Sequence, residues 1–400
     1  MQKKLYVLLI LILAAALFIN AGSAYVVDNY DKKNNILTFS GTGGEIKPAD
    51  SNHPSFSYMY PMVSLVVIKS GVTSVGKNAF DACRNLKSII IEDGLEKIGS
   101  FGFARTSLDS IEIPDSVTSI GQGAFSANDY LSYAKLSNNI TALETSLFQG
   151  CKYLTGIEIP ENVTKIGNSA FALCGLTSIV IPDSVTTIGD KSFYQCTDLK
   201  CVTFGQSLKR IGEGAFQLCY KLPYVILPEG LTDIESKAFS DCSNLYAVVL
   251  PESLKRAGSD VFKGIKEESI IYLSGGSDSP LVNQISYSPG KTAIAFLNGG
   301  KIISMPGQHV LAEPVKDGCI FDGWYTNEDW TGGNVSRYDA SDCEYYYAKW
   351  IEAPVPEKTA AKEENVPVQT TASTAPNSPV FPAAILFGCA AALLLCKRNQ

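Results

Sequence analysis

The residue types that most often carry catalysis are scarce in this chain. Its 400 residues include two histidines, His53 and His309, which lie far apart in the sequence. A serine or cysteine nucleophile needs a base and an orienting group within hydrogen-bond reach, and no motif brings such groups to either histidine. The sequence has neither a phosphate-binding glycine loop nor a His-Glu-x-x-His zinc motif. We therefore expect a protein that is not an enzyme and that uses no cofactor or metal.

Acidic residues recur, but at one place in a repeated pattern. Each of four carboxylates directly follows a proline in the same predicted turn: Asp115, Glu161, Asp183 and Glu229. Glycoside hydrolysis uses a matched pair of carboxyl groups that flank the bond to be broken. Acids in one repeated turn form a solvated edge instead, so this arrangement does not predict a hydrolase.

Most of the eleven cysteines also follow a repeated pattern. In an exported protein such a number would suggest a disulfide framework. Six of them, however, lie three residues after a recurring phenylalanine, which predicts a packing column of small buried side chains; they are Cys83, Cys151, Cys174, Cys196, Cys219 and Cys242. Metal binding is disfavoured because no Cys-x-x-Cys motif occurs and no histidine lies near the column.

Two further cysteines, Cys319 and Cys343, lie outside this pattern. If the segment is exported, the oxidising surroundings favour a bridge between them. It would close a loop of about 25 residues and restrict the unfolded chain. The alternative is two buried thiols that pack as small apolar groups, and the sequence leaves it open.

One phenylalanine recurs nine times at steps of 22 or 23 residues, and its positions are Phe80, Phe103, Phe125, Phe148, Phe171, Phe193, Phe216, Phe239 and Phe262. A fixed period of this length predicts a solenoid, in which each unit buries its apolar side chains against its neighbours. Stacked at roughly 4.8 Å per unit, nine units would form an array about 40 Å long.

The fifth and sixth units show the pattern most clearly. The alternation Ile157-x-Ile159 predicts a strand that ends at Pro160, because proline cannot donate to a ladder. In the sixth unit a second β-branched stretch, residues 185–188, follows the turn. The segment around Phe193 has room for about one helical or 3₁₀ turn.

The repeat Ile-x-Ile-Pro-x-Ser-Val-Thr-x-Ile-Gly-x-x-Ala-Phe-x-x-Cys resembles the BspA-like leucine-rich repeat family of surface proteins over residues 65–272. The resemblance implies a mainly β leucine-rich-repeat solenoid of about nine units. It also implies an N-terminal β cap in residues 25–64, where a short hairpin around residues 35–44 covers the first unit. Glu144 and Glu235 replace the glycine of Ile-Gly, so a positive φ is not expected to be obligatory at that position.

Residues 292–350 break the repeat and follow a connector at residues 273–291. They contain all three tryptophans, and Gly323-Trp324-Tyr325 and Tyr347-Ala-Lys-Trp350 resemble the internalin-B B-repeat. That resemblance implies a small β-grasp-like domain. We expect Trp324 and Trp350 to lie in its core, because a domain of about 60 residues needs large buried side chains. Trp330 is expected to be exposed, where it could stack on a sugar.

The two ends of the chain carry apolar stretches. Residues 1–24 are typical of a signal peptide, with an uncleaved anchor as the rival interpretation. Residues 351–379, rich in Pro, Ala, Thr, Glu and Lys, predict a disordered stalk. Residues 380–396 predict a transmembrane helix, followed by a basic cytoplasmic tail at residues 397–400.

The net charge of −7 gives no electrostatic basis for binding nucleic acid. Three Asn-x-Ser/Thr tripeptides are compatible with glycosylation, at Asn139, Asn162 and Asn334.

These observations predict a membrane-anchored surface protein with an extracellular part that acts as an adhesin or ligand-binding module. The ligand would be a protein or a glycan. We expect it to contact outward strand positions of the solenoid and the exposed tryptophan: Tyr133, Glu158, Val180, Thr203, Tyr224, Ile226, Val249 and Trp330. The alternative is a structural cell-envelope component that self-associates through its repeats.

Overall fold

The structure is a computed structural model that describes residues 26–47, 62–277, 279–285, 292–302, 305, 309–330, 334–337 and 345–352. The predicted signal peptide, nearly all of the stalk, the transmembrane segment, His53 and Cys343 lie outside these residues. Among the described residues, no helix has the length and apolar character needed to span a membrane.

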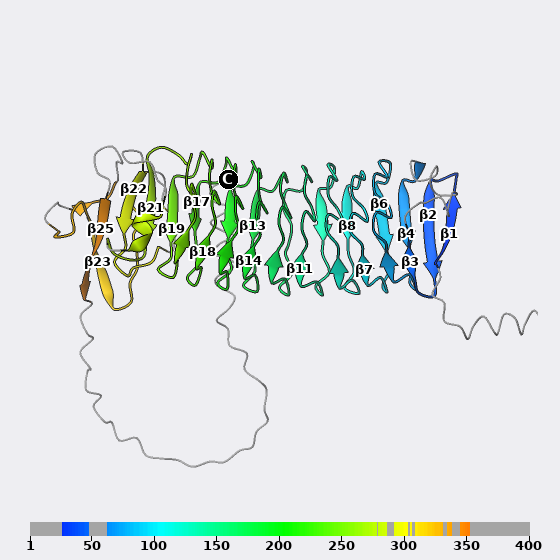
Figure 1. The fold of residues 1–400 in the computed structure, drawn as a ribbon, viewed down its shortest axis with the longest axis horizontal. Coiled ribbons are helices and arrows are strands. Elements are labelled where there is room, and N and C mark those ends of the chain that lie inside the picture. Colours follow the sequence, from blue (N-terminus) through cyan, green and yellow to red (C-terminus); the bar gives the residue numbers. More distant parts are fainter. Residues whose placement is uncertain are drawn as a thin grey trace, which may run out of the picture.

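The chain winds into a long rod with two rows of short strands along it (Figure 1). The first row comprises β1 (Val26–Asp31), β2 (Ile36–Gly41), β4 (Leu65–Ile68), β6 (Ser88–Ile91), β8 (Ser110–Glu112), β10 (Tyr133–Lys135), β13 (Ser178–Val180), β15 (Cys201–Thr203), β17 (Tyr224–Ile226), β19 (Ala247–Leu250), β21 (Ser269–Leu273) and β22 (Thr292–Phe296). Apart from the β1–β2 hairpin, the pairs within this row are parallel.

The second row also consists of parallel pairs. It comprises β3 (Glu45–Ile46), β5 (Ser74–Val75), β7 (Lys97–Ile98), β9 (Ser119–Ile120), β11 (Ala142–Leu143), β12 (Lys165–Ile166), β14 (Thr187–Ile188), β16 (Arg210–Ile211), β18 (Asp233–Ile234) and β20 (Arg256–Ala257). A solenoid with its apolar side chains between two rows of strands is the predicted fold, and the structure confirms it.

The third side of each coil carries the recurring phenylalanine and is built from turns. Residues two before and two after the phenylalanine have left-handed backbone, as in Lys191 (φ 54°) and Gln195 (φ 56°) around Phe193. The Phe193 N–H donates to the carbonyl of Ala215 in the next coil at 2.7 Å. The single helical turn that the sequence predicted here is therefore wrong, because alternating left-handed residues let these turns form their own ladder of hydrogen bonds between coils.

The nine phenylalanine rings are fully buried and form one stack. Successive ring centroids lie 4.9 to 5.8 Å apart. The glycine that follows the second-row strand serves close packing instead of a left-handed φ. A Cβ on Gly99 would lie 2.6 Å from the backbone nitrogen of Lys77. Neither Glu144 nor Glu235 has a positive φ, as predicted.

The cysteine column is buried and its thiols are free, as predicted. The structure adds that these thiols are hydrogen-bond donors. In five consecutive coils the cysteine Sγ donates to the carbonyl of the phenylalanine in the preceding coil at 3.0 to 3.3 Å. Asn128 takes the cysteine position in its coil, and its amide Nδ2 donates to the same kind of carbonyl, that of Phe103, at 2.8 Å.

Both ends of the rod are covered. At the N-terminal end the β1–β2 hairpin pairs with β4, at the place where the cap is expected. At the other end the period continues beyond the predicted limit of residue 272, because β22 pairs with β21 at a step of 23 residues, Ser269 to Thr292. Ile285 lies one period after Phe262 and is buried, which adds a tenth coil. A 3₁₀-helix, η2 (Pro280–Asn283), lies in this coil.

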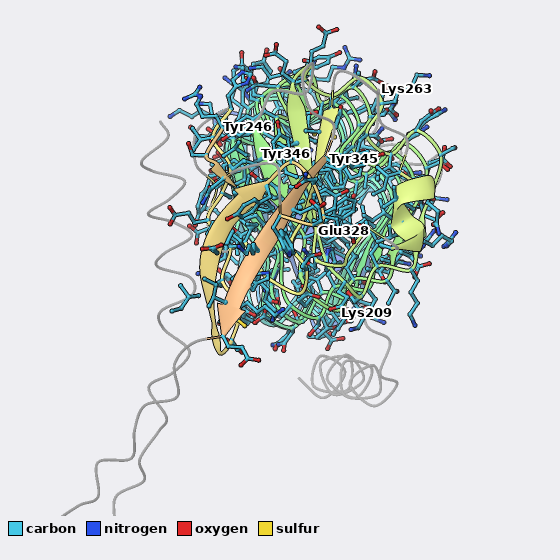
Figure 2. The ribbon with its side chains drawn as sticks, turned by 90° about the vertical axis from the view of Figure 1, so that its left-hand side faces the viewer. Lys209, Tyr246, Lys263, Glu328, Tyr345 and Tyr346 are labelled. Atoms are coloured by element: carbon cyan, nitrogen blue, oxygen red, sulfur yellow. The ribbon has the colours of Figure 1, made fainter. Side chains whose placement is uncertain are left out.

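The separate β-grasp-like domain expected in residues 292–350 is not what the structure shows. Strand β25 (Tyr345–Glu352) pairs in parallel with β22, and β23 (Cys319–Tyr325) and β24 (Asn334–Val335) extend the same sheet. Viewed from this end, β25 crosses the end of the rod, and Tyr345 and Tyr346 lie at the start of this strand (Figure 2). Tyr345 and Tyr347 pack on the solenoid core, whereas Tyr346 faces a second apolar cluster.

Candidate ligand-binding surface

The outward side chains of the first row form the surface that the sequence selected for ligand binding. Over its middle part the strands alternate as expected, with the central residue buried and its neighbours facing outward. Tyr133 is 49% exposed and Val180 44% exposed. Glu158 is also exposed, and Thr203 is half-buried. These four predicted residues therefore lie along one accessible face.

At the C-terminal end the same face is covered, which corrects the expectation for Val249. Its side chain is 4% exposed and belongs to the second apolar cluster, against which Tyr224 and Ile226 are partly buried. The covering segment is fixed by two hydrogen bonds at Ala312. Its N–H donates to Tyr272 Oη at 3.0 Å, and its carbonyl accepts from Trp324 Nε1 at 2.8 Å.

A sequence signal for this cover exists. Strands β21 and β22 are continuously apolar or small and are buried at every position, unlike the alternating strands of the middle coils. Such runs are typical of strands that are covered on both faces. The covering element is supplied by residues 309–325 and β25.

The tryptophans divide largely as expected. Trp324 is 2% exposed and lies in the second cluster, and Trp350 is half-buried with its Nε1 donating to the carbonyl of Leu297 at 2.9 Å. Trp330 is half-buried, because its ring packs edge-on against Tyr325 at a centroid distance of 5.8 Å. It is therefore less open than the sequence suggested, and its role in binding stays a prediction.

The ladder of the first row is interrupted between β6 and β8, between β10 and β13 and between β15 and β17. At the middle interruption the intervening coil contributes no first-row strand in the described structure. Strand β10 pairs with β8, and β13 pairs with β15. Between them, residues 156–160 form no backbone hydrogen bond with either strand in the described structure. The second row stays continuous at this level, with Ala142 opposite Lys165, and the phenylalanine rings remain stacked. The coils are therefore splayed on one side only.

Small residues on both sides of the interruption explain it locally. Gly156 occupies the outward position where neighbouring coils have Tyr133 and Ser178, and a Cβ added there would meet no atom within 4 Å. Ala134 occupies the inward position where most coils have isoleucine or valine. Glycine weakens a strand, and a small inward residue gives little packing to hold the coils together. Ile157 is consequently half-buried at this point.

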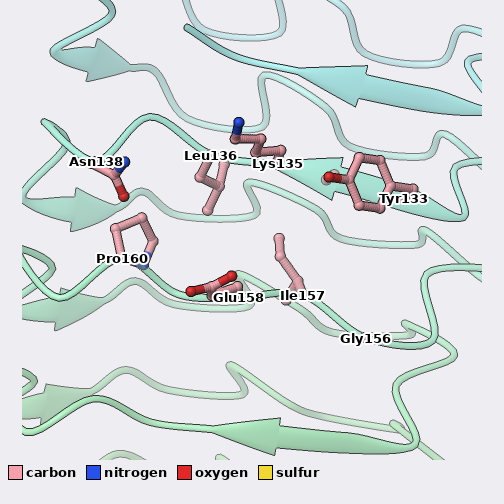
Figure 3. A pocket seen from close by; sticks show the side chains of 9 residues that line it. Tyr133, Lys135, Leu136, Asn138, Gly156, Ile157, Glu158 and Pro160 are labelled. Carbon is pink, nitrogen blue, oxygen red and sulfur yellow. The ribbon is translucent and has the colours of Figure 1, made fainter. Parts of the chain in front are cut away.

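The result is a slot of about 350 Å³ with both polar and apolar walls. Tyr133 and Lys135 on β10, with Leu136 directly after it, lie across from Ile157 and Glu158 of the neighbouring segment (Figure 3). Lys135 and Glu158 form no ion pair in the described part of the chain. The backbone groups that would continue the ladder are open to a ligand. Such a site can pair with extended backbone and offers one charge of each sign beside an aromatic ring.

Two exposed tyrosines lie in the segments that lead into this site, and neither was predicted from the sequence as a binding residue. Tyr130 and Tyr153 are 61% and 60% exposed and their rings stack at 6.3 Å. Each precedes the outward strand position of its coil, Tyr133 or Gly156, by three residues. The signal was present, because the equivalent positions in other coils hold polar residues such as Asp198 and Lys221.

The remaining candidate residues have structural partners. The side-chain amides of Asn139, Asn162 and Asn334 donate to the carbonyls of Asp115, Asn138 and Asp322. Their glycosylation stays a prediction.

Cys319 has a free, half-buried thiol, and Cys343 lies outside the described residues. Strand β23 places Glu352 opposite Cys319, whereas Cys343 precedes the other end of β25 in the sequence. A bridge needs Cα atoms within about 7 Å. Cys319 forms no disulfide with another described residue. Its bridge with Cys343 stays a prediction.

The structure offers no assembled catalytic group within the described residues. Burial raises the pKa of the Cys196 and Cys242 thiols to about 12, which keeps them protonated and unreactive. His309 Nε2 lies 3.3 Å from Glu268 at the surface of the C-terminal end. No group of three or more histidine, cysteine or acidic side chains in the described ranges could hold a metal ion.

A family model described as BspA type leucine-rich repeat region matches residues 52–177 and 164–278. These two matches together span more than half of the chain. The chain belongs to the BspA type leucine-rich repeat family. Among curated proteins, none matches it. Solenoids of this family are typical of interaction modules without catalytic activity.

Several solved structures have a similar repeat architecture. A leucine-rich repeat protein from Bacteroides ovatus is 22% identical, over 63% of this chain and 94% of that chain, with a TM-score of 0.27. The pneumococcal vaccine antigen PcpA is 18% identical over 69% and 92%, with a TM-score of 0.39. A leucine rich cell surface protein from Faecalibacterium prausnitzii is 20% identical over 67% and 98%, with a TM-score of 0.29. Likeness at this level carries no information on function.

Proposed function

We propose that this chain is a cell-surface protein that binds a protein partner through the outward face of its first row of strands. The slot between β10 and residues 156–160 is the centre of the site. The observation that carries the proposal is the missing first-row strand at residues 156–160 of the described structure, which leaves a slot beside β10 while the second row and the phenylalanine stack stay closed.

The slot's chemistry favours a polypeptide ligand. Exposed edges of β-structure recognise extended peptides through main-chain hydrogen bonds, and side-chain pockets add specificity. Here Tyr133 supplies an amphipathic ring, of the type enriched in binding hot spots. Lys135 and Glu158 supply opposite charges that can select the partner's sequence. Membership in a family of repeat proteins that bind other proteins supports the same function.

The placement at the cell surface rests on the sequence ends. An N-terminal signal peptide, a stalk and a C-terminal anchor would hold the rod outside the cell, and binding there would make the protein an adhesin. We assign residues 292–350, which carry the B-repeat-like motifs, a structural role in closing the end of the solenoid. Their strands continue the solenoid sheet, which supports this role.

Amide hydrogen exchange on the full-length chain tests the slot before any partner is known. Amides of residues 156–158 should exchange at least about tenfold faster than those of β13 and β15, because they lack ladder hydrogen bonds. Gly156→Ser, which copies Ser178 of the next coil, provides a matched variant that should slow this exchange. Equal protection of residues 156–158 and β13 in the unmodified chain would refute the slot.

A partner tests the function itself. With extracts of candidate host or neighbouring-cell surfaces, Tyr133→Ala and Glu158→Ala should weaken capture of one heterologous protein, whereas Ile90→Ala on the same face should not. Sedimentation of the purified chain distinguishes binding of a partner protein from the alternative function, self-association in the cell envelope. Self-assembly that depends on concentration and is lost in Tyr133→Ala would identify an envelope component that binds copies of itself.

A further inference from the structure

A second groove lies on the third side of the rod, which is formed by the phenylalanine turns. It measures about 640 Å³ and crosses five consecutive coils, from Asp81 to Leu173. Its residues come from the turns, whereas the slot is lined by first-row segments and the residues that follow them. The two sites therefore involve different residues and can be tested separately.

The groove arises from small residues in two successive coils. The position two residues after the recurring phenylalanine has left-handed backbone and carries a longer side chain in five of the nine coils, among them Arg105, Gln195 and Leu218, and alanine or glycine in the other four. In two adjacent coils it is Ala127 and Gly150 instead. Their lack of side chains leaves a depression between Arg105 on one side and the exposed Leu173 on the other.

Polar walls of this groove are held in place but keep hydrogen-bonding capacity. Arg105 donates two hydrogen bonds to Asp81, from Nε to Oδ1 at 2.9 Å and from Nη2 to Oδ2. The remaining guanidinium N–H groups point to no other partner among the described residues, and the arginine side chain is largely exposed. Ser126 and the half-buried Gln149 add a hydroxyl and an amide with no hydrogen-bond partner in the described part of the chain.

Apolar contacts are also present. The ring of Phe101 is half-buried and lies against Gly123, where a Cβ would come within 2.4 Å of Phe101 Cε1. Leu173 forms the aliphatic end of the groove. The site thus combines an aromatic ring, an aliphatic side chain and neutral donors and acceptors, while its one cation and one anion neutralise each other.

We propose that this groove binds a neutral oligosaccharide. A saccharide presents C–H faces to aromatic and aliphatic side chains, and hydroxyl groups to planar amide, carboxylate and guanidinium groups. Adjacent phenylalanine rings beneath the groove are 5.1 to 5.8 Å apart, a step about the length of one linked pyranose unit. Successive coils therefore present their side chains at the spacing of successive sugars.

The backbone of this side argues against a peptide ligand. The main-chain groups of the turns already bond between coils, as in Phe125 N–H to the carbonyl of Leu147 and Ala127 N–H to the carbonyl of Gln149. Along the groove, the described turns offer no open strand edge for main-chain pairing. A charged polymer is also disfavoured, because Asp81 neutralises Arg105. The groove therefore has to recognise its ligand through hydrogen bonds from uncharged side chains and through apolar contacts.

Calorimetric titration of the full-length chain with cellohexaose, maltohexaose and the hexamer of N-acetylglucosamine tests the proposal. We expect at least one to bind. Ala127→Gln should weaken it at least about tenfold by filling the depression, a loss comparable to that of a good polar contact. This variant should fold, because Gln195 already occupies the equivalent position with a similar φ of 56° against 54°. Arg105→Ala should weaken binding similarly.

The matched control is Leu218→Gln, which introduces the same side chain in the same column outside the groove and should leave binding unchanged. Tyr133→Ala in the slot should also leave it unchanged, so failure here is distinguishable from failure of the proposed protein site. Absence of binding by all three saccharides would overturn the proposal. So would undiminished binding by Ala127→Gln, or a peptide that occupies the groove while the saccharides do not.

Discussion

The Sγ atom of Cys196 donates a hydrogen bond to the carbonyl oxygen of Phe171, 3.1 Å away in the preceding coil. The same bond recurs along the column, so each of these cysteines connects its coil to the phenylalanine backbone of the preceding coil. A small buried side chain alone would fill this space without making the connection. The donor, and not only the volume, therefore explains the residue type.

Substitution at Cys196 separates these two roles. Cys196→Ser keeps a donor, whereas Cys196→Ala removes it and leaves the Phe171 carbonyl with only its bond from the Cys174 N–H. We expect the alanine variant to be the less stable of the two by about 1 kcal/mol, the usual contribution of a hydrogen bond. Denaturant unfolding of both variants measures the difference. A serine variant less stable than the alanine variant would show that the thiol acts only as a small apolar group.

Alkaline pH should destabilise the solenoid through the same column. Burial raises the pKa of the Cys83, Cys196 and Cys242 thiols from 9.0 to about 12. Between these values the unfolded chain loses its thiol protons while the folded chain keeps them. The free energy of unfolding should therefore fall as pH rises from 9 towards 12, by on the order of 1 kcal/mol per pH unit for each thiol. Below pH 9 the thiols are protonated in both states, so their ionisation should not make the free energy of unfolding depend on pH there.

The control for this pH dependence is Cys196→Ser with Cys242→Ser. Neither serine hydroxyl titrates in this range, so the fall in stability should be less steep than in the unmodified chain. Parallel pH profiles for the two proteins, measured by urea unfolding, would show that tyrosines or lysines cause the alkaline loss instead.

The phenylalanine stack should respond differently at its centre and at its end. Phe171 packs between two rings, at centroid distances of 5.8 and 5.4 Å, so Phe171→Ala should cost about 3–5 kcal/mol. Among the described residues Phe262 has one ring neighbour, at 5.8 Å, and Phe262→Ala should cost clearly less. Equal shifts in the denaturant midpoint of the two variants would contradict a stack in which each ring is stabilised by both neighbours.

Trp324 should anchor the C-terminal cover to the solenoid. Trp324→Ala removes a buried ring and its bond to the Ala312 carbonyl, for an expected cost of about 3–5 kcal/mol. Because the cover shares a sheet with β21 and β22, their amides should lose exchange protection. Trp330→Ala is the matched control and should cost less than about 1 kcal/mol, since its ring is half-buried at the edge. Unchanged protection in Trp324→Ala would mean that the cover and the solenoid are independent.

The sequence period was sufficient to predict the coil order, the buried ring stack and the inward and outward sides of the middle strands. It did not predict the tenth coil, because Ile285 replaces phenylalanine at the 23-residue step. It also did not show that residues 309–325 cover Val249. That contact depends on how the chain returns over the sheet after β22, which no local pattern encodes.

The slot was predictable only in part. Tyr133 and Glu158 were selected as outward residues, and both lie at the slot. Gly156 and Ala134 are each compatible with a strand when taken alone. The ladder opens where these two small residues stand one position apart in adjacent coils, one outward and one inward, and this depends on the register between coils. The sequence gives that register only once the stacking is known.

Site-specific photocrosslinking tests the central claim most directly. A photoreactive phenylalanine analogue would replace Tyr133 at the slot and, as a control, Ile90, which is 52% exposed on the same face. On intact cells in contact with their natural neighbours, the account predicts a cross-link from position 133 to one heterologous protein and none from position 90. Equal labelling from both positions, or cross-links from position 133 only to a second copy of the chain, would contradict it.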